Sequence, residues 1–391
     1  MKATLKQIEH LAQTIGPRAS ATAAERAGHE YVRQQLELIG CATRVESFDS
    51  AKSVYWPYMI ALALLLGAEA GSWCVSGASG VAVVAVVSVV ALVSLLLEML
   101  GMANPLRWGL PRSRSQNVIG VTRAAGEMRQ RIAMMAHVDT HRTPWIWRSS
   151  RTFRVYLILS TLGMLGAVAL TGVLQAGTFD LTYQLRLWSR LPTLVVALTF
   201  VMVAQAEFTP WTAGANDNAS GVGVVLALAA RAQREPLPHT ELWWVATGCE
   251  EVSAYGSADF VRRHRTEFAD GLVLVVDTIS GRDTWPTVFT SEKLLWPLRY
   301  PANLLREAEM LGQQRPEFGL RFQGFQGAYS DAFHLLKARI FCLTIIGCTR
   351  DGWLPHWHQP SDILAHVDLT ALARSQAFVW ELLRKLTPPT S

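Results

Sequence analysis

The stretch Gly-Ala-Asn-Asp-Asn-Ala-Ser-Gly, residues 214–221, separates two segments of different character. An apolar run ends just before it, and a helical pattern at 222–232 follows it. Glycines at both ends permit a tight turn, and Ser220 is expected to cap the helix that follows. The helix N-terminus would then face whatever Asp217 binds, and a carboxylate on such a turn can bridge two cations. Taken alone, the stretch fits a polar turn without chemistry equally well.

Outward from this turn, strand and helix patterns alternate along the polar parts of the chain. Toward the C-terminus we expect helices at 222–232, 254–264, 301–311 and 368–386, and strands at 242–246, 272–276 and 339–346. Toward the N-terminus we expect two helices within 1–38 and strands at 42–48, 117–121 and 131–135. This alternation predicts an α/β fold, a three-layer sandwich with a mixed central sheet and helices on both faces.

The composition is too apolar for an ordinary soluble domain of this length. Half of the 391 residues are hydrophobic, and the mean hydropathy is +0.19, which indicates membrane segments. Four apolar runs are each about long enough to cross a bilayer, at 56–74, 81–100, 155–174 and 188–206. Buried hairpins within the core are the alternative explanation.

The four runs form two pairs and are predicted as about four transmembrane helices inserted as two hairpins. We expect hairpins at 55–101 and 155–206. The remaining segments, 1–54, 102–154 and 207–391, would form a single discontinuous domain. Each hairpin would return the chain to the side of the membrane that it left.

The distribution of arginine predicts the orientation of these spans. Ten arginines lie in 102–154, whereas the loop at 176–190 has only Arg186 and Arg190. Because cytoplasmic loops carry the excess of basic residues, we expect both termini and the α/β domain in the cytoplasm. No signal peptide is expected, since the first apolar run begins near Tyr55. Anionic lipid beside the spans explains the arginines better than nucleic acid does.

Five groups of residues along the polar segments carry the side chains of a metal site. They are His137 with Asp139, Asp217, Glu250-Glu251, Asp277, and His358 with Asp362. Each group lies at the end of a predicted strand or in the loop after it, where α/β sheets place their sites. Carboxylate and imidazole ligands without thiolates are typical of catalytic rather than structural zinc.

These groups, in their order, resemble the M28 family of zinc peptidases, which contains co-catalytic aminopeptidases and related carboxypeptidases. The shared pattern is His-x-Asp, Gly-Ala-x-Asp-Asn-x-Ser-Gly, Glu-Glu, Asp and His-x-x-x-Asp, together with Gly16-Pro17-Arg18 near the N-terminus. The resemblance implies that Asp217 bridges two zinc ions. It further implies that one ion is completed by His137 and Asp277, and the other by Glu251 and His358.

The resemblance also implies roles around the metals. Glu250 would be the general base, Asp139 would orient His137, and the Asp217–Asn218 peptide bond would be cis. His356 is a rival of His358, which the spacing to Asp362 favours. Ser330-Asp331 matches a family pair, but Ala332 replaces the histidine that usually follows. Tyr329 is a candidate substrate-binding residue, and His141 is interpreted as a loop residue.

The predicted function is that of a membrane-embedded zinc aminopeptidase with two Zn²⁺ per chain, a peptide substrate, contact with the lipid bilayer and no nucleic-acid partner. A glutaminyl-cyclase-like aminoacyltransferase with one zinc is the second hypothesis, and a non-catalytic membrane scaffold is the third. The presence of both His137 and Glu250-Glu251 favours the peptidase. The sequence leaves the oligomeric state open.

Overall fold

The computed structural model describes residues 1–75, 77–176, 187–293 and 295–388. The chain divides into two compact units. The first, here called the sheet unit, contains Met1–Lys52, Arg112–Thr143 and Pro210–Ser391. The second, the helical unit, contains Ser53–Pro111 and Pro144–Thr209. Residues 102–111 and 144–154, which the sequence analysis groups with the sheet, therefore lie in the helical unit.

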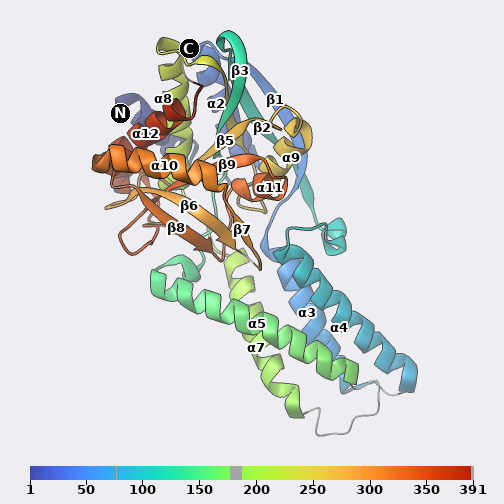
Figure 1. Ribbon diagram of the computed structural model, residues 1–391. Coiled ribbons are helices and arrows are strands. Elements are labelled where there is room, and N and C mark those ends of the chain that lie inside the picture. The colour runs from blue at the N-terminus through green and yellow to red at the C-terminus, as the bar shows by residue number, and fades with distance from the viewer. Residues whose placement is uncertain (76, 177–186, 294, 389–391) are drawn as a thin grey trace. The chain divides into compact units, whose positions relative to one another are not determined.

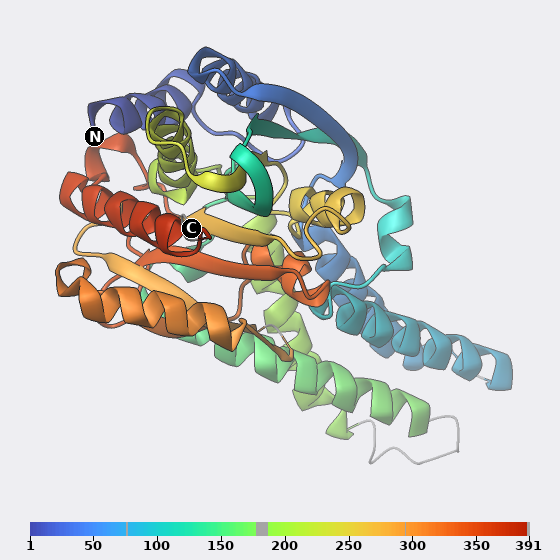
Figure 2. The ribbon, with the colours of Figure 1, turned by 45° about the horizontal axis from the view of Figure 1, so that its top comes forward.

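The described part of the sheet unit is built on one mixed sheet of nine strands (Figure 1). The order is β1-β2-β4-β3-β5-β9-β6-β7, and β8 pairs with β6. The strands are β1 Ala42–Ala51, β2 Arg112–Thr122, β3 Ala125–His137, β4 Pro238–Thr247, β5 Leu272–Asp277, β6 Trp285–Lys293, β7 Pro297–Arg299, β8 Arg321–Gln326 and β9 Phe341–Cys348. The four central strands, β4, β3, β5 and β9, run parallel to one another, and β5 and β9 lie side by side in Figure 2.

Helices cover both faces of this sheet, as two consecutive residues of β4 demonstrate. Trp243 and Trp244 point to opposite faces because side chains alternate along a strand. Trp243 packs edge-on against Phe260 of α9, Tyr255–His264. Trp244 shares its face with its cross-strand partner Gly120, where an added Cβ would lie 3.0 Å from Leu36 of α2, Ala23–Ile39. The predicted three-layer α/β fold is confirmed.

The other helices of the sheet unit are short or amphipathic. They are α1 Lys2–Glu9, α8 Gly221–Arg234, α10 Ala302–Gln314, α11 Ala332–Lys337 and α12 Leu369–Lys385. The chain is continuously buried from Ala215 to Leu226, across the central turn and the start of α8. The apolar residues of α8 therefore pack against the sheet, and the turn before α8 is held at the sheet edge.

In the described part of the helical unit, four long helices pack together. They are α3 Tyr55–Ser72, α4 Gly77–Met99, α5 Ser150–Ala176 and α7 Arg190–Glu207. Alanine, leucine and valine side chains from all four form one apolar cluster. Small residues allow α5 and α7 to approach closely: a Cβ added at Gly163 would lie 2.4 Å from Thr199 Oγ1.

Three of these helices, α4, α5 and α7, are long and apolar enough to cross a membrane. The fourth predicted span, α3, is helical but does not reach the same hydropathy over 18 residues. The reason lies in its ends, since it begins Tyr-Trp-Pro-Tyr and contains Glu69 near its C-terminus. Most of the loop on which the predicted orientation depends, including Arg186, lies outside the described residues.

Candidate metal centre

The ends of three adjacent parallel strands bring the first acidic and imidazole side chains together. His137 is the last residue of β3, and Asp277 is the last residue of β5. Glu250-Glu251 follow the end of β4 by three residues. Because β3 lies between β4 and β5 and is parallel to both, these carboxyl ends meet at one edge of the sheet.

Asp217 lies between two imidazoles from distant parts of the chain. Its Oδ1 is 3.3 Å from His137 Nε2, and its Oδ2 is 3.1 Å from His358 Nε2. His137 Nε2 is also 3.5 Å from Asp277 Oδ1, and His358 Nε2 is 3.3 Å from Glu251 Oε2. The structure thus places a separate imidazole beside each side-chain oxygen of Asp217, and a separate second carboxylate beside each of these imidazoles.

Asp139 organises the neighbouring groups through its carboxylate. The backbone N–H groups of Glu250 and Glu251 donate to its Oδ1 and Oδ2 at 3.1 and 3.2 Å, and Ser20 Oγ donates to Oδ2 at 2.6 Å. The carboxylate lies 3.6 Å from His137 Nδ1, too far for a hydrogen bond. His137 Nδ1 instead donates to the backbone carbonyl of Asp139 at 3.1 Å, which leaves the lone pair of a neutral ring on Nε2.

The turn at 214–221 is held by side chains on both flanks. Asp362 accepts hydrogen bonds from the backbone of Asn216 and Asp217 at 2.6 and 3.0 Å. The peptide bond between Asp217 and Asn218 is cis, as the resemblance implies. The predicted Ser220 cap is wrong, because Ser220 already has helical backbone angles and its hydroxyl donates to the Asn216 carbonyl. Asn218 Oδ1 accepts from Gly221 N–H at 3.0 Å instead.

Arg18, from the Gly-Pro-Arg motif, ties the N-terminal segment to this edge of the sheet. The side chain is fully buried. Its guanidinium donates to the carbonyls of Val138 at 2.7 Å, Ala213 at 2.9 Å and Gly214 at 3.0 Å. A planar cation with five donors suits a site lined by carbonyls from several loops. The residue therefore joins the end of β3 to the turn that carries Asp217.

The centre contains more buried acids than bases. Burial raises the pKa of Glu250 well above its ordinary value and that of Glu251 to about 7. Burial alone would lower the pKa of His358, but Glu251 and Asp217 raise it to about 9. The contacts of Asp217 with His137 and His358 outweigh its burial and lower its pKa. Protons are thus retained where carboxylates crowd together, as expected of a site made for cations.

The donor set fits divalent metal ions. Among the residues that the structure describes, three groups of side chains have ligand atoms within 4.8 Å of one another: His137, Asp217 and Asp277; His137, Glu250 and Glu251; and His141, Glu251 and His358. Glu251 Oε1 is buried and has no hydrogen-bond partner in the described part of the chain. Imidazole and carboxylate donors without thiolate match catalytic zinc.

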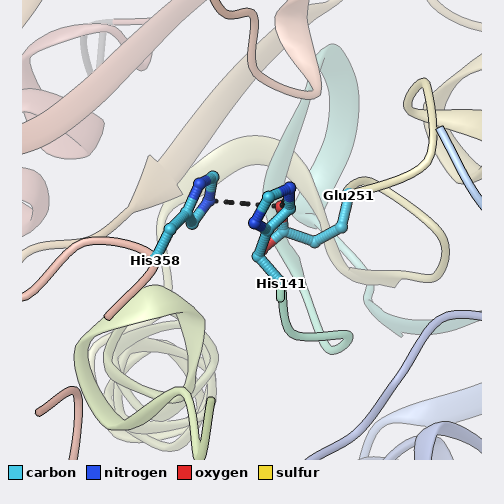
Figure 3. Close-up of side chains that lie close together, drawn as sticks. All are labelled: His141, Glu251 and His358. Carbon is cyan, nitrogen blue, oxygen red and sulfur yellow. Dashed lines mark ion pairs between the residues drawn. The ribbon is translucent and has the colours of Figure 1, made fainter. Parts of the chain in front are cut away.

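Two residues that the sequence analysis set aside belong to this region. His141, interpreted as a loop residue, is buried and stacks on His358 with ring centroids 3.7 Å apart (Figure 3). Asp331 is fully buried, accepts from Thr247 Oγ1 at 2.6 Å and has its pKa raised to about 7 by burial. The spacing His-x-Asp-x-His is the only sequence signal that would have indicated His141.

Two further residues from the sequence analysis, His356 and Tyr329, belong to none of these three groups. His356, the rival of His358, stacks on His366 with ring centroids 4.5 Å apart and forms a hydrogen bond with Ser361. Tyr329 is half-buried beside Phe333, with ring centroids 5.4 Å apart. Its expected contact with substrate stays a prediction.

Comparison with known proteins agrees with this geometry. The model of peptidase family M28 matches residues 197–383. This segment contains Asp217, Glu250-Glu251, Asp277 and His358, whereas His137 lies before it. The resemblance to zinc peptidases of family M28 is confirmed. Among curated protein sequences, none matches the chain.

Solved structures share the fold at low sequence identity. A zinc aminopeptidase from Bacillus subtilis superposes with a TM-score of 0.60 and 13% identity, over 99% of this chain and 95% of the other. An aminopeptidase from Aneurinibacillus sp. strain AM-1 gives 0.60 and 14%, over 100% and 94%. The glutaminyl cyclase from Bacteroides thetaiotaomicron gives 0.58 and 15%, over 98% and 97%. The fold is therefore common to zinc aminopeptidases and glutaminyl cyclases.

Proposed function

We propose that this chain is a membrane-embedded aminopeptidase that removes N-terminal residues from peptides and holds two zinc ions in its sheet unit. The supporting observation is Asp217, whose two oxygens face the Nε2 atoms of His137 and His358 at 3.3 and 3.1 Å. Two nearby cations need a shared anion to offset their repulsion. Asp277 would complete the ligands of one ion, and Glu251 those of the other.

Glu250 is the general base of the proposed reaction. A divalent pair held at this centre supplies Lewis acidity, which acidifies water and polarises the scissile carbonyl. Glu250 takes a proton from the attacking water and delivers it to the leaving amine. Its backbone N–H is fixed on Asp139, and burial raises the pKa of its carboxyl group. Such a carboxyl group can hold the proton between the two transfers.

Strand pairing constrains how the helical unit crosses the membrane. β1 precedes α3 and α4, β2 follows them, and the two strands pair from Ala42↔Val121 to Ala51↔Arg112. Segments of one sheet share one side of a membrane, so α3 and α4 together cross it an even number of times. The pairing of β3 with β4 imposes the same parity on α5 and α7. We therefore propose that α3 crosses together with α4, although its own hydropathy is lower.

Arginine distribution supports a cytoplasmic sheet unit with both termini on that side. A cysteine introduced at Gly177, in a variant without exposed native thiols, tests this orientation. An impermeant thiol reagent should label it in intact cells, because the proposal places the tip of the second hairpin outside. Protection in intact cells, with labelling only after lysis, would contradict it.

Metal stoichiometry is the first test of the proposed function. Full-length protein purified in detergent without chelators, then supplied with zinc and desalted, should contain two zinc ions per chain by elemental analysis. It should hydrolyse aminoacyl amides and dipeptides. No bound zinc after this treatment would contradict the proposal and favour a non-catalytic scaffold.

The fold shared with glutaminyl cyclases supports a second candidate, an aminoacyltransferase that cyclises N-terminal glutamine. This alternative predicts one tightly held zinc and release of ammonia from glutaminyl peptides without cleavage of the peptide bond. The presence of His137 beside Asp217 and Asp277 favours the peptidase. An assay of both products on one glutaminyl dipeptide separates the two reactions.

A further inference from the structure

His141 is a third buried imidazole at the metal centre. It lies four residues after His137 and is 6% exposed. Its ring stacks on that of His358 at an interplanar angle of 16°, and its Nε2 is 4.0 Å from Glu251 Oε2 (Figure 3). The side chain thus reaches the half of the centre formed by Glu251 and His358, although His141 follows the end of β3 by four residues.

The outer nitrogen of His141 is fixed in the manner of a metal ligand. Nδ1 lies 2.8 Å from the backbone carbonyl of Arg142, which can only accept, so Nδ1–H donates. A neutral ring then carries its lone pair on Nε2, on the side of Glu251. His137 has the same arrangement, with Nδ1 on the carbonyl of Asp139. Metal-bound histidines generally donate their other ring N–H to such an acceptor.

The distances between donor atoms agree with a shared ion. Two donors at ~2.0–2.2 Å from one zinc lie about 3.3–4 Å apart, depending on the angle between the bonds. Glu251 Oε2 is 3.3 Å from His358 Nε2 and 4.0 Å from His141 Nε2. At 4.0 Å the lone pair of His141 and the carboxylate of Glu251 form no hydrogen bond. A cation held between them would attract both the lone pair and the carboxylate.

We propose that His141 is an additional ligand of the zinc ion held by Glu251 and His358; the inference rests on the proposed function. The Nε2 atoms of both rings lie near Glu251 Oε2, that of His358 at 3.3 Å and that of His141 at 4.0 Å. The two metal positions then differ: His137 is the one imidazole of the first, whereas the second has two. The second position then has four protein ligands where the first has three, and the added imidazole is a donor that suits zinc, so the second position binds zinc more tightly and fills first.

Zinc affinity tests the assignment without measuring activity. Detergent-purified protein is stripped of metal and titrated with zinc against a chromogenic chelator. His141→Ala should weaken the tighter of two zinc equivalents by about 10–100-fold and leave the weaker one unchanged. His356→Ala is the matched control, because His356 lies in the same loop as His358 but stacks on His366. It should leave both affinities unchanged.

X-ray absorption of the wild-type protein loaded with two zincs gives a second measurement that needs no variant. Scattering from imidazole should correspond to three rings shared by two ions, those of His137, His141 and His358. Two rings, or unchanged zinc affinities in His141→Ala, would overturn the inference while leaving the proposed function intact. A wild-type protein that binds no zinc and hydrolyses nothing would instead show that the proposed function has failed.

Discussion

The two units of the chain both bury acidic side chains, but they place different partners opposite them. In the helical unit, the carboxylate of Glu98 accepts hydrogen bonds from Arg107 Nε and Nη2 at 2.8 and 2.5 Å and from Asn104 Nδ2 at 2.7 Å. In the sheet unit, Asp217 and Glu251 crowd against further acids, and the basic side chains among them are imidazoles. Glu98 is neutralised by a cationic side chain, so the ion pair joins parts of the helical unit. The sheet unit has more buried carboxylates than basic side chains, which predicts that a bound metal ion supplies the missing positive charge.

The largest expected difference between the units is in catalysis. Glu250→Gln keeps the shape of the side chain and the backbone hydrogen bond to Asp139 but removes the group that accepts a proton. We expect kcat for aminoacyl amides to fall about 10²–10⁴-fold or more, with KM and zinc content close to wild type. Steady-state kinetics and elemental analysis on one preparation check this. Near-wild-type turnover with two zincs bound would exclude Glu250 as the base.

The corresponding change in the helical unit should affect stability rather than turnover. Glu98→Gln leaves the buried Arg107 guanidinium without its carboxylate, which costs about 3–5 kcal/mol. We expect easier unfolding of the helical unit in detergent, with unchanged kcat per folded molecule. Replacing Glu98 by Leu and Arg107 by Met together is the matched control, because removing both charges should recover much of the loss. A fall in kcat of the folded Glu98→Gln protein would contradict the prediction that buried acids of the helical unit affect stability and those of the sheet unit affect catalysis.

The pH dependence of stability sharpens the comparison further. In the sheet unit, burial raises the pKa of Glu251 and Asp362 to about 7, and His358 is raised to about 9 by Glu251 and Asp217 against its burial. Each value exceeds that of the unfolded chain, so the folded metal-free protein binds more protons. Its stability should therefore fall as pH rises from about 4 to about 9. Zinc takes the place of these protons.

Thermal unfolding with chelator and with excess zinc, at about pH 5 and about pH 9, tests this linkage. The stabilisation by zinc should be larger at the higher pH and reach about 4 kcal/mol at a thousandfold excess over Kd. The helical unit should show no such response to zinc. A metal-free sheet unit that becomes more stable as pH rises through this window would contradict the charge excess.

The proposed ligand set could be drawn from the sequence because its chemistry is local. Asp217 lies in an eight-residue motif, and His137 and Asp277 end strands that are apolar enough to recognise without a structure. The alternation of strands and helices placed these ends at one edge of a sheet, and the structure confirms the fold. The helical unit was visible from hydropathy alone. The sequence predicts α3 as a span from the length of its apolar run, and the pairing of β1 with β2 gives an independent argument that it crosses together with α4.

Other features depend on tertiary contacts and left no clear pattern. The strands β6, β7 and β8 were not predicted; Pro286 lies within β6 and Pro297 begins β7, and proline argues against a strand. They form because β6 pairs with β9 and with β8. His141 reaches the metal centre only because the chain turns after β3. No periodicity in the sequence reports such a turn.

The smallest expected effect concerns packing between α5 and α7, and it tests whether the units are independent. A Cβ added at Gly163 would lie 2.4 Å from Thr199 Oγ1, whereas one at Gly172 on the same helix meets nothing within 4 Å. Gly163→Ala should destabilise the helical unit by about 1–3 kcal/mol through overpacking. Gly172→Ala should stabilise it by about 0.5–1 kcal/mol, since alanine favours a helix. Denaturant unfolding in detergent checks the opposite signs. Hydrolysis per folded molecule should be the same in both variants, because the proposed catalytic groups all belong to the sheet unit. A lower kcat in folded Gly163→Ala alone would mean that packing of these helices is coupled to the metal centre.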